Sequence, residues 1–89
     1  MIPTLPIRTL ADLGQSVRAA RKEAGLQATQ LAQKTGRSRD LLHRLETGKD
    51  VTTGALLNVL HGMGYTIRLE KLGLPTLDEM RQRFAEDDD

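Results

Sequence analysis

Apolar side chains recur every three or four positions along most of the first 64 residues, a spacing typical of amphipathic helices that bury one face. The pattern predicts helices over residues 9–24, 27–35, 39–47 and 53–63. A glycine follows each helix and favours the left-handed backbone conformation that ends many helices: Gly25, Gly36, Gly48 and Gly64. This part of the chain is therefore expected to be all-α.

The period changes after the fourth helix. Tyr65, Ile67 and Leu69 alternate with polar residues, which predicts a β-strand over residues 65–71. A single strand leaves backbone groups unpaired, so it needs a partner. One candidate is residues 1–8, an extended arm with two prolines. The other is the same strand of a second copy, which would close a two-fold homodimer, and we favour this second arrangement.

The last residues carry a separate signal. Thr76 and Glu79 form a T-x-x-E capping box, which predicts a short helix with one apolar face. That face consists of Leu77, Met80 and Phe84. Because about ten residues are few for an isolated helix in water, we expect it either to dock on its own domain or to wait for a partner protein and be otherwise disordered. The chain then divides into an arm (1–8), a helical domain (9–64), a dimerisation strand (65–71) and a tail (72–89).

Two charged residues fall where the pattern expects the core. Arg21 lies on the apolar stripe of the first helix, which includes Leu10, Leu13, Val17, Ala20 and Ala24. Glu46 lies at the edge of the apolar side of the third helix. A lone buried charge costs several kcal/mol, and pairing is the usual resolution. We therefore predict a partly buried ion pair that joins the two helices; the alternative is that each side chain separately extends its charge to solvent.

Composition excludes several classes of function. The chain of 89 residues suits one domain, and it contains no cysteine, so disulfides and thiolate metal sites are excluded. The two histidines are far apart, and there is no glycine-rich phosphate loop. We therefore expect neither an enzyme nor a cofactor. There is no apolar run long enough to span a membrane and no signal-peptide pattern, so a soluble, cytoplasmic protein is expected.

The charge is unevenly distributed. The net charge is +1, but residues 1–50 hold nine Lys and Arg against five Asp and Glu, a balance of +4. Residues 51–89 hold four against seven, a balance of −3. A basic front half and an acidic back half indicate two surfaces with different partners.

The second and third predicted helices, joined at Gly36, have the arrangement of a helix-turn-helix. One side of the third helix is apolar, and the other carries Arg39, Asp40, His43, Arg44 and Thr47. A helix anchored in this way fits the major groove of DNA, where an arginine can bond the O6 and N7 atoms of guanine. Asp40 can accept from a cytosine amine or pair with Arg44 four residues on. His43 is either an exposed polar residue or a DNA contact.

The run from Arg18 to Lys49 resembles the XRE, or lambda-repressor-like, family of helix-turn-helix proteins. The resemblance covers about residues 10–64 and rests on Arg21, Gly25, Leu26, Leu31, Ala32, Gly36, Ser38, Leu42, Leu45, Glu46 and Gly48. It implies a domain of four to five helices and a pair between the arginine of the first helix and the glutamate of the third. It also implies base contacts from Arg39, Asp40 and Arg44, with His43 as a further candidate, and phosphate contacts near residues 47–49.

The chain departs from the family at two positions. The family usually starts its second helix with Thr-Gln, whose glutamine holds a phosphate, but here Gln27 and Ala28 stand there. That contact is either lost or supplied by a neighbouring side chain. The residue after Gly36 is usually apolar, but Arg37 reaches a phosphate or points to water. The candidate DNA-binding residues are Gln27, Thr29, Gln30, Arg37, Ser38, Arg39, Asp40, His43, Arg44, Thr47 and Lys49.

The order of the elements narrows the resemblance to HipB-like antitoxins. These are small dimers that repress their own operon from a palindromic operator and hold a HipA-like kinase toxin. This resemblance implies DNA contact through the basic half and toxin contact through Leu77, Met80 and Phe84. The alternative is a stand-alone, phage-type regulator without a toxin partner.

Overall fold

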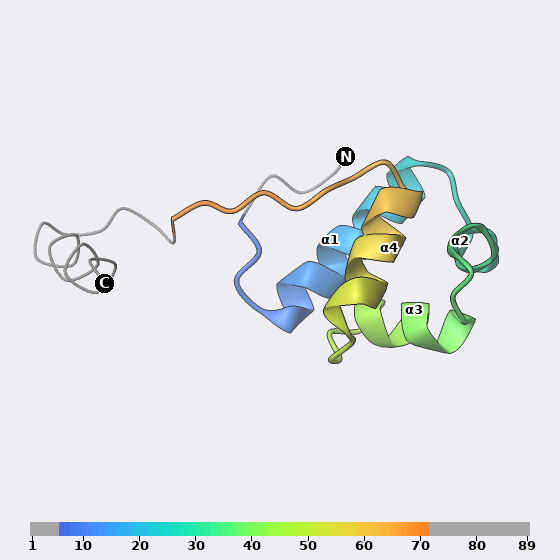
Figure 1. Cartoon of the computed structure of the whole chain (residues 1–89), viewed down its shortest axis with the longest axis horizontal. Coiled ribbons are helices and arrows are strands. Elements are labelled where there is room, and N and C mark those ends of the chain that lie inside the picture. Colours follow the sequence, from blue (N-terminus) through green and yellow to red (C-terminus); the bar gives the residue numbers. More distant parts are fainter. Residues whose placement is uncertain (1–5, 72–89) are drawn as a thin grey trace, which may run out of the picture.

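Polar residues at the helix starts determine where the helices begin. The computed structural model describes residues 6–71, and this part of the chain forms α1 (Leu10–Glu23), α2 (Ala28–Thr35), α3 (Arg39–Glu46) and α4 (Thr53–Gly62) (Figure 1). At the start of α1, α3 and α4, a side-chain hydroxyl accepts the backbone N–H of the residue three positions further on; the capping residues are Thr9, Ser38 and Thr52. The predicted helices are confirmed to within one or two residues at each end.

The same hydrogen-bond arrangement ends each of these helices at a glycine. At the end of α2, the Gly36 N–H donates to the Gln33 carbonyl and the Arg37 N–H donates to the Ala32 carbonyl, which is the Schellman pattern. Gly36 has a φ of 69°, a conformation that costs a glycine little. The chain therefore turns sharply after α2 and enters α3 only three residues later.

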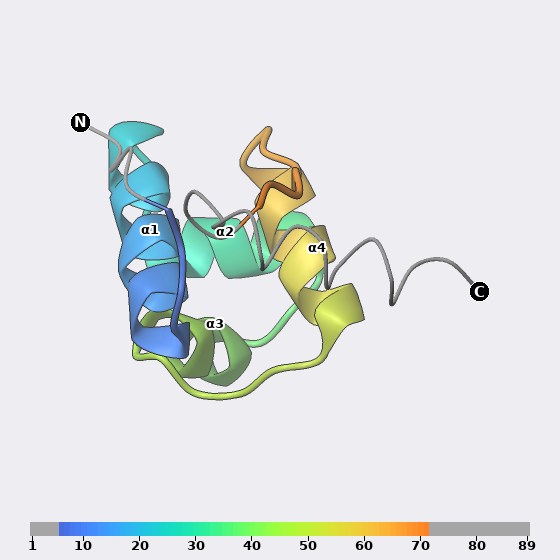
Figure 2. The same cartoon turned by 90° about the vertical axis from the view of Figure 1, so that its left-hand side faces the viewer.

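Each of the four helices contributes to one core. Val17, Leu31, Leu42, Leu45 and Val59 are fully buried together. α3 packs on α1 and α2, whereas α4 packs on α2. Figure 2 shows α1 and α4 on opposite sides, with α2 crossing between them and α3 below. The outer side of α3 thus lies at one edge of the molecule.

The prediction that the whole apolar stripe of α1 is buried is wrong at the two ends of the stripe. Leu10 is 46% exposed and Ala24 is also exposed, whereas the middle of the stripe is buried. α3 ends at Glu46, and the chain that follows turns away at Gly48, beside Ala11. Gly48, which lies against this first turn of α1, has no side chain that could cover Leu10.

Residues 65–71 have neither helix nor strand assigned to them in the described part of the chain. The Tyr65 N–H donates to the Leu60 carbonyl, so Tyr65 completes the end of α4. Ile67 and Leu69 are 44% and 91% exposed. Residues 6–8 do not pair with this segment, and its pairing with a second copy stays a prediction. The predicted tail helix, with Leu77, Met80 and Phe84, lies outside the described residues, as do residues 1–5.

Candidate nucleic-acid interface

α3 is held by its apolar side and shows its polar side to solvent. Leu42 and Leu45 are buried, and Leu41 is half-buried against the core. On the opposite side every residue is exposed: Arg39, Asp40, His43, Arg44 and Thr47. This division matches the wheel expected from the sequence, and it gives α3 an outward face that a DNA groove could receive.

Arg21 and Glu46 join α1 to the end of α3 in a two-point ion pair. Arg21 Nε donates to Glu46 Oε2 at 2.7 Å, and Arg21 Nη2 donates to Glu46 Oε1 at 3.0 Å. Arg21 Nη1 also donates to the Leu26 carbonyl at 3.0 Å. The two side chains are only 12% and 10% exposed. The hydrogen bond to Glu46 raises the pKa of Arg21, although burial acts in the other direction, so the guanidinium stays charged at every ordinary pH.

Gly14 brings the backbones of α1 and α3 into close contact. A Cβ atom on Gly14 would lie 2.5 Å from the Glu46 carbonyl oxygen and 2.6 Å from that of Leu45. The hydrophobic pattern alone does not identify this position. Its signal is the spacing, because Gly14 stands three residues before Val17 and seven before Arg21, on the buried side of α1.

Arg39, Asp40 and His43 are the outward residues of α3 whose side chains have no hydrogen-bond or ion-pair partner within the described residues. Arg39 is the first residue of the helix, and the N-terminal part of a recognition helix is the part that reaches base edges. The alternative pairing of Asp40 with Arg44 does not form in the described chain.

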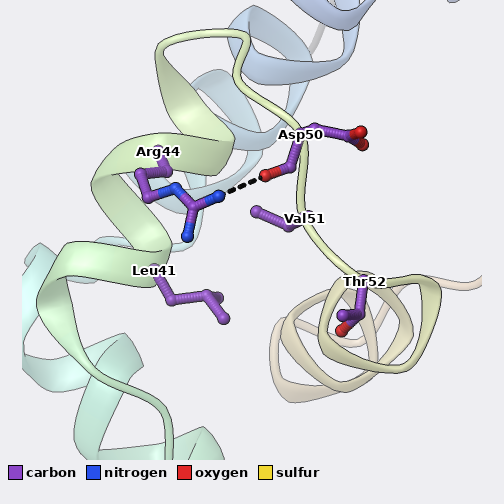
Figure 3. A pocket seen from close by; sticks show the side chains of 5 residues that line it. All are labelled: Leu41, Arg44, Asp50, Val51 and Thr52. Carbon is purple, nitrogen blue, oxygen red and sulfur yellow. Dashed lines mark hydrogen bonds between the residues drawn. The ribbon is translucent and has the colours of Figure 1, made fainter.

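Arg44 has a partner that the sequence analysis did not foresee. Its Nη2 donates to the Asp50 carbonyl at 2.8 Å, in the loop that follows α3 (Figure 3). The guanidinium lies at the rim of an open hollow lined by Leu41, Arg44, Asp50, Val51 and Thr52. A backbone carbonyl has no signature in a pattern of side chains, so nothing in the sequence marked this contact.

Arg37 is also engaged with the protein. Its Nε donates to Asn58 Oδ1 on α4 at 2.8 Å, across 21 residues of sequence. Neither of the two alternatives from the sequence, a phosphate or open water, included this contact. Because a guanidinium carries five N–H donors, the side chain keeps donors for a second partner.

The start of α2 carries the remaining amide candidates. The Gln27 N–H donates to Gln30 Oε1 at 2.7 Å, so the oxygen of that amide caps the helix. The amide NH2 of Gln30 then remains as the donor group, which is the kind of group a phosphate oxygen needs. Thr29 is exposed next to it.

Three candidates lie at the two ends of α3, and Lys49 is the strong hydrogen-bond donor among them. The Ser38 hydroxyl caps the helix start, and the Thr47 hydroxyl donates to the His43 carbonyl at 2.8 Å. Since a phosphate only accepts hydrogen bonds, Thr47 has no donor to spare; its backbone N–H also donates to His43. Lys49 is exposed two residues later, and its ammonium is the cation at this end of α3.

Residues 6–71 contain neither a cluster of metal ligands nor a membrane-spanning helix. Within that range there is no group of three or more His, Asp or Glu side chains that could hold a metal ion. No helix of that range has the length and hydropathy needed to cross a bilayer.

Comparison with known families agrees with this geometry. A family model described as a helix-turn-helix domain matches residues 12–66, a range that includes α2, α3 and the turn between them. The chain belongs to this helix-turn-helix family. Among solved structures, it is similar to the clp gene regulator ClgR from C. glutamicum, with 27% identity and a TM-score of 0.62 over 73% of this chain and 85% of that chain. A search of curated proteins gives no match. In this helix-turn-helix chain, α2 and α3 are the two helices joined by the short turn that begins at Gly36.

Proposed function

We propose that the protein is a sequence-specific DNA-binding regulator of transcription, with α3 lying in the major groove. The observation that carries the proposal is the exposed side of α3, where Arg39 stands at the helix start with no partner in the described chain. Membership of a helix-turn-helix family supports it, and so does the similarity to a structure named as a gene regulator.

Base choice is assigned to the first turn of α3. Arg39 carries five donors in a planar fork, which matches the O6 and N7 acceptors of guanine. Asp40 accepts from a cytosine amine, since no other described residue occupies its carboxylate. His43, one turn further on, reaches an adjacent base or phosphate.

Phosphate contacts are assigned to groups with donors to spare at the two sides of α3. Lys49 supplies an ammonium after the helix. Gln30 supplies an amide NH2 before it, with Gln27 and Thr29 as neighbours, and Arg37 supplies the donors that Asn58 does not use. Such contacts fix the register of the protein on DNA but carry no base information.

The exposed side chains of Ile67 and Leu69 support a homodimer. Pairing of residues 65–71 with the same segment of a second copy would cover both and satisfy the backbone of each. The two recognition helices would then lie about 34 Å apart, one turn of DNA, and the operator would be a palindrome.

Two biological roles fit this DNA-binding activity. The antitoxin of a HipBA-type operon is the first, and it rests on the HipB-like order of elements and on the basic and acidic halves of the chain. A stand-alone regulator is the second, favoured by the likeness to the clp gene regulator. Co-purification with the product of an adjacent kinase-like reading frame, with and without residues 72–89, separates them: capture that needs the tail supports the antitoxin role.

A footprint on the DNA upstream of the protein's own gene tests the proposal itself. We expect one protected palindrome and an affinity that falls steeply with salt, with a slope of about −0.9 for each phosphate contact. Equal binding to every duplex, with no protected site there or in a pool of random sequences, would contradict a sequence-specific regulator.

A further inference from the structure

Arg44 holds two consecutive residues of the loop between α3 and α4. Its backbone carbonyl accepts the Lys49 N–H at 2.8 Å. Its side-chain Nη2 donates to the Asp50 carbonyl, also at 2.8 Å (Figure 3). One residue of α3 thus holds the peptide group that precedes Lys49 and the one between Asp50 and Val51.

From Lys49 to Val51, this loop has few other attachments. α3 packs on α1 and α2, and α4 packs on α2, so residues 47–52 connect two helices that share little contact with each other. Lys49, Asp50 and Thr52 are exposed, and Val51 alone among residues 49–52 is half-buried against the core. Figure 3 shows Val51 pointing from the loop toward α3, below the Arg44–Asp50 hydrogen bond. Without the side chain of Arg44, the backbone of Lys49 and Asp50 would keep only the hydrogen bond from the Lys49 N–H to the Arg44 carbonyl.

We infer that Arg44 is a positioning residue that fixes this loop, so that Lys49 meets a DNA phosphate at a set place beyond the end of α3. The inference rests on the proposed DNA-binding function. It gives Arg44 a task other than reading a base, although its sequence position on the outward face of α3 suggests a base contact. Because the Arg44 side chain binds the Asp50 carbonyl, it does not pair with Asp40, one turn earlier on α3.

The two tasks for Arg44 differ in what they do to specificity. Loss of a base contact weakens binding to the cognate duplex far more than to a random one, so the ratio of the two affinities falls. Loss of a phosphate contact weakens both by the same factor, and the ratio stays constant. A positioning residue for Lys49 has a further property: its loss and the loss of Lys49 remove the same contact, so the two effects are not additive.

The test is a double-mutant cycle with Arg44→Met and Lys49→Gln in the full chain. Methionine keeps an unbranched apolar stem but has no donor, and Arg44 is exposed, so the fold should survive. Affinity is measured for the footprinted cognate duplex and a random duplex over a range of salt. Arg18→Met, an exposed arginine on α1, controls for the loss of one positive charge.

We expect each single variant to lose about fivefold in affinity for both duplexes, as about 1 kcal/mol implies, and the double variant to lose little more. The salt slope should fall by about 0.9 in all three. Arg18→Met should change either affinity by less than about twofold.

Two results would overturn the inference. If the ratio of cognate to random affinity falls tenfold in Arg44→Met, Arg44 reads a base. A double variant that loses about 25-fold would show independent contacts, with the same consequence.

A measurement without DNA separates this inference from the proposed function. In Arg44→Met, the backbone amide resonances of Lys49 and Val51 should shift, and the Lys49 N–H should exchange faster, while the amides of α1 and α2 stay unchanged. If those loop amides do not respond, Arg44 does not position the loop, whatever the DNA results are. If they respond but the wild type binds no duplex, the proposed function fails and the structural role of Arg44 stands.

Discussion

The ion pair between Arg21 and Glu46 and the contact between Arg44 and Asp50 differ in how far the sequence reveals them. The first involves two charges at positions that periodicity assigns to the core, and a buried charge requires a partner, so the pair could be expected from sequence. The second joins a side chain to a backbone carbonyl, and the link from Arg37 to Asn58 joins two exposed polar groups. Neither contact places a charged group at a position that the hydrophobic pattern assigns to the core, so that pattern does not predict either contact.

Glu46→Gln should lower the free energy of unfolding by about 2–4 kcal/mol, because it leaves the Arg21 guanidinium nearly buried without its counter-charge. The double variant Arg21→Met with Glu46→Leu should lose clearly less than the sum of Arg21→Met and Glu46→Leu alone, since it leaves no unpaired charge. Urea unfolding measures both. Strict additivity of the two changes would show that the pair contributes nothing as a pair.

Helix boundaries followed from local chemistry, because the capping residues and the glycines that end the helices lie next to the segments they bound. The exposure of Leu10 could not be predicted in this way, because it depends on how the end of α3 lies against α1. The close approach of α1 to α3 at Gly14 belongs to the same class of feature. A contact between helices depends on how the two helices pack, and the spacing of apolar residues along either helix does not predict it.

Two glycine substitutions give a matched test of that packing. Gly14→Ala should destabilise the protein by about 1–3 kcal/mol, because its Cβ would meet the carbonyl groups of Leu45 and Glu46. Gly54→Ala, in α4 with no atom within 4 Å of the new Cβ, should instead stabilise it by roughly 0.5–1 kcal/mol. Thermal unfolding of the two variants gives the sign of each change. A stabilising Gly14→Ala would mean that α1 and α3 do not approach as closely as described.

For the whole molecule, the alternation over residues 65–71 is clear in the sequence, but a strand forms only with a partner, and one chain does not specify which partner it takes. If the strand pairs across a homodimer, replacing Ile67 and Leu69 together by serine should give monomers at micromolar concentration in light scattering. Thr66→Ser with Arg68→Ser, on the opposite face of the strand, is the control and should leave the dimer intact. A dimer that survives the first pair of changes would point to an interface between helices.

Recognition of DNA by the outward side of α3 is tested most directly by the ratio of the dissociation constants for random and cognate duplexes, compared between the wild type and Arg39→Ala. The account predicts that the substitution weakens cognate binding by about 1–3 kcal/mol and lowers this ratio, because it removes a base contact and leaves the phosphate contacts in place. An unchanged ratio, with both duplexes weakened equally or not at all, would contradict base reading by this face of α3.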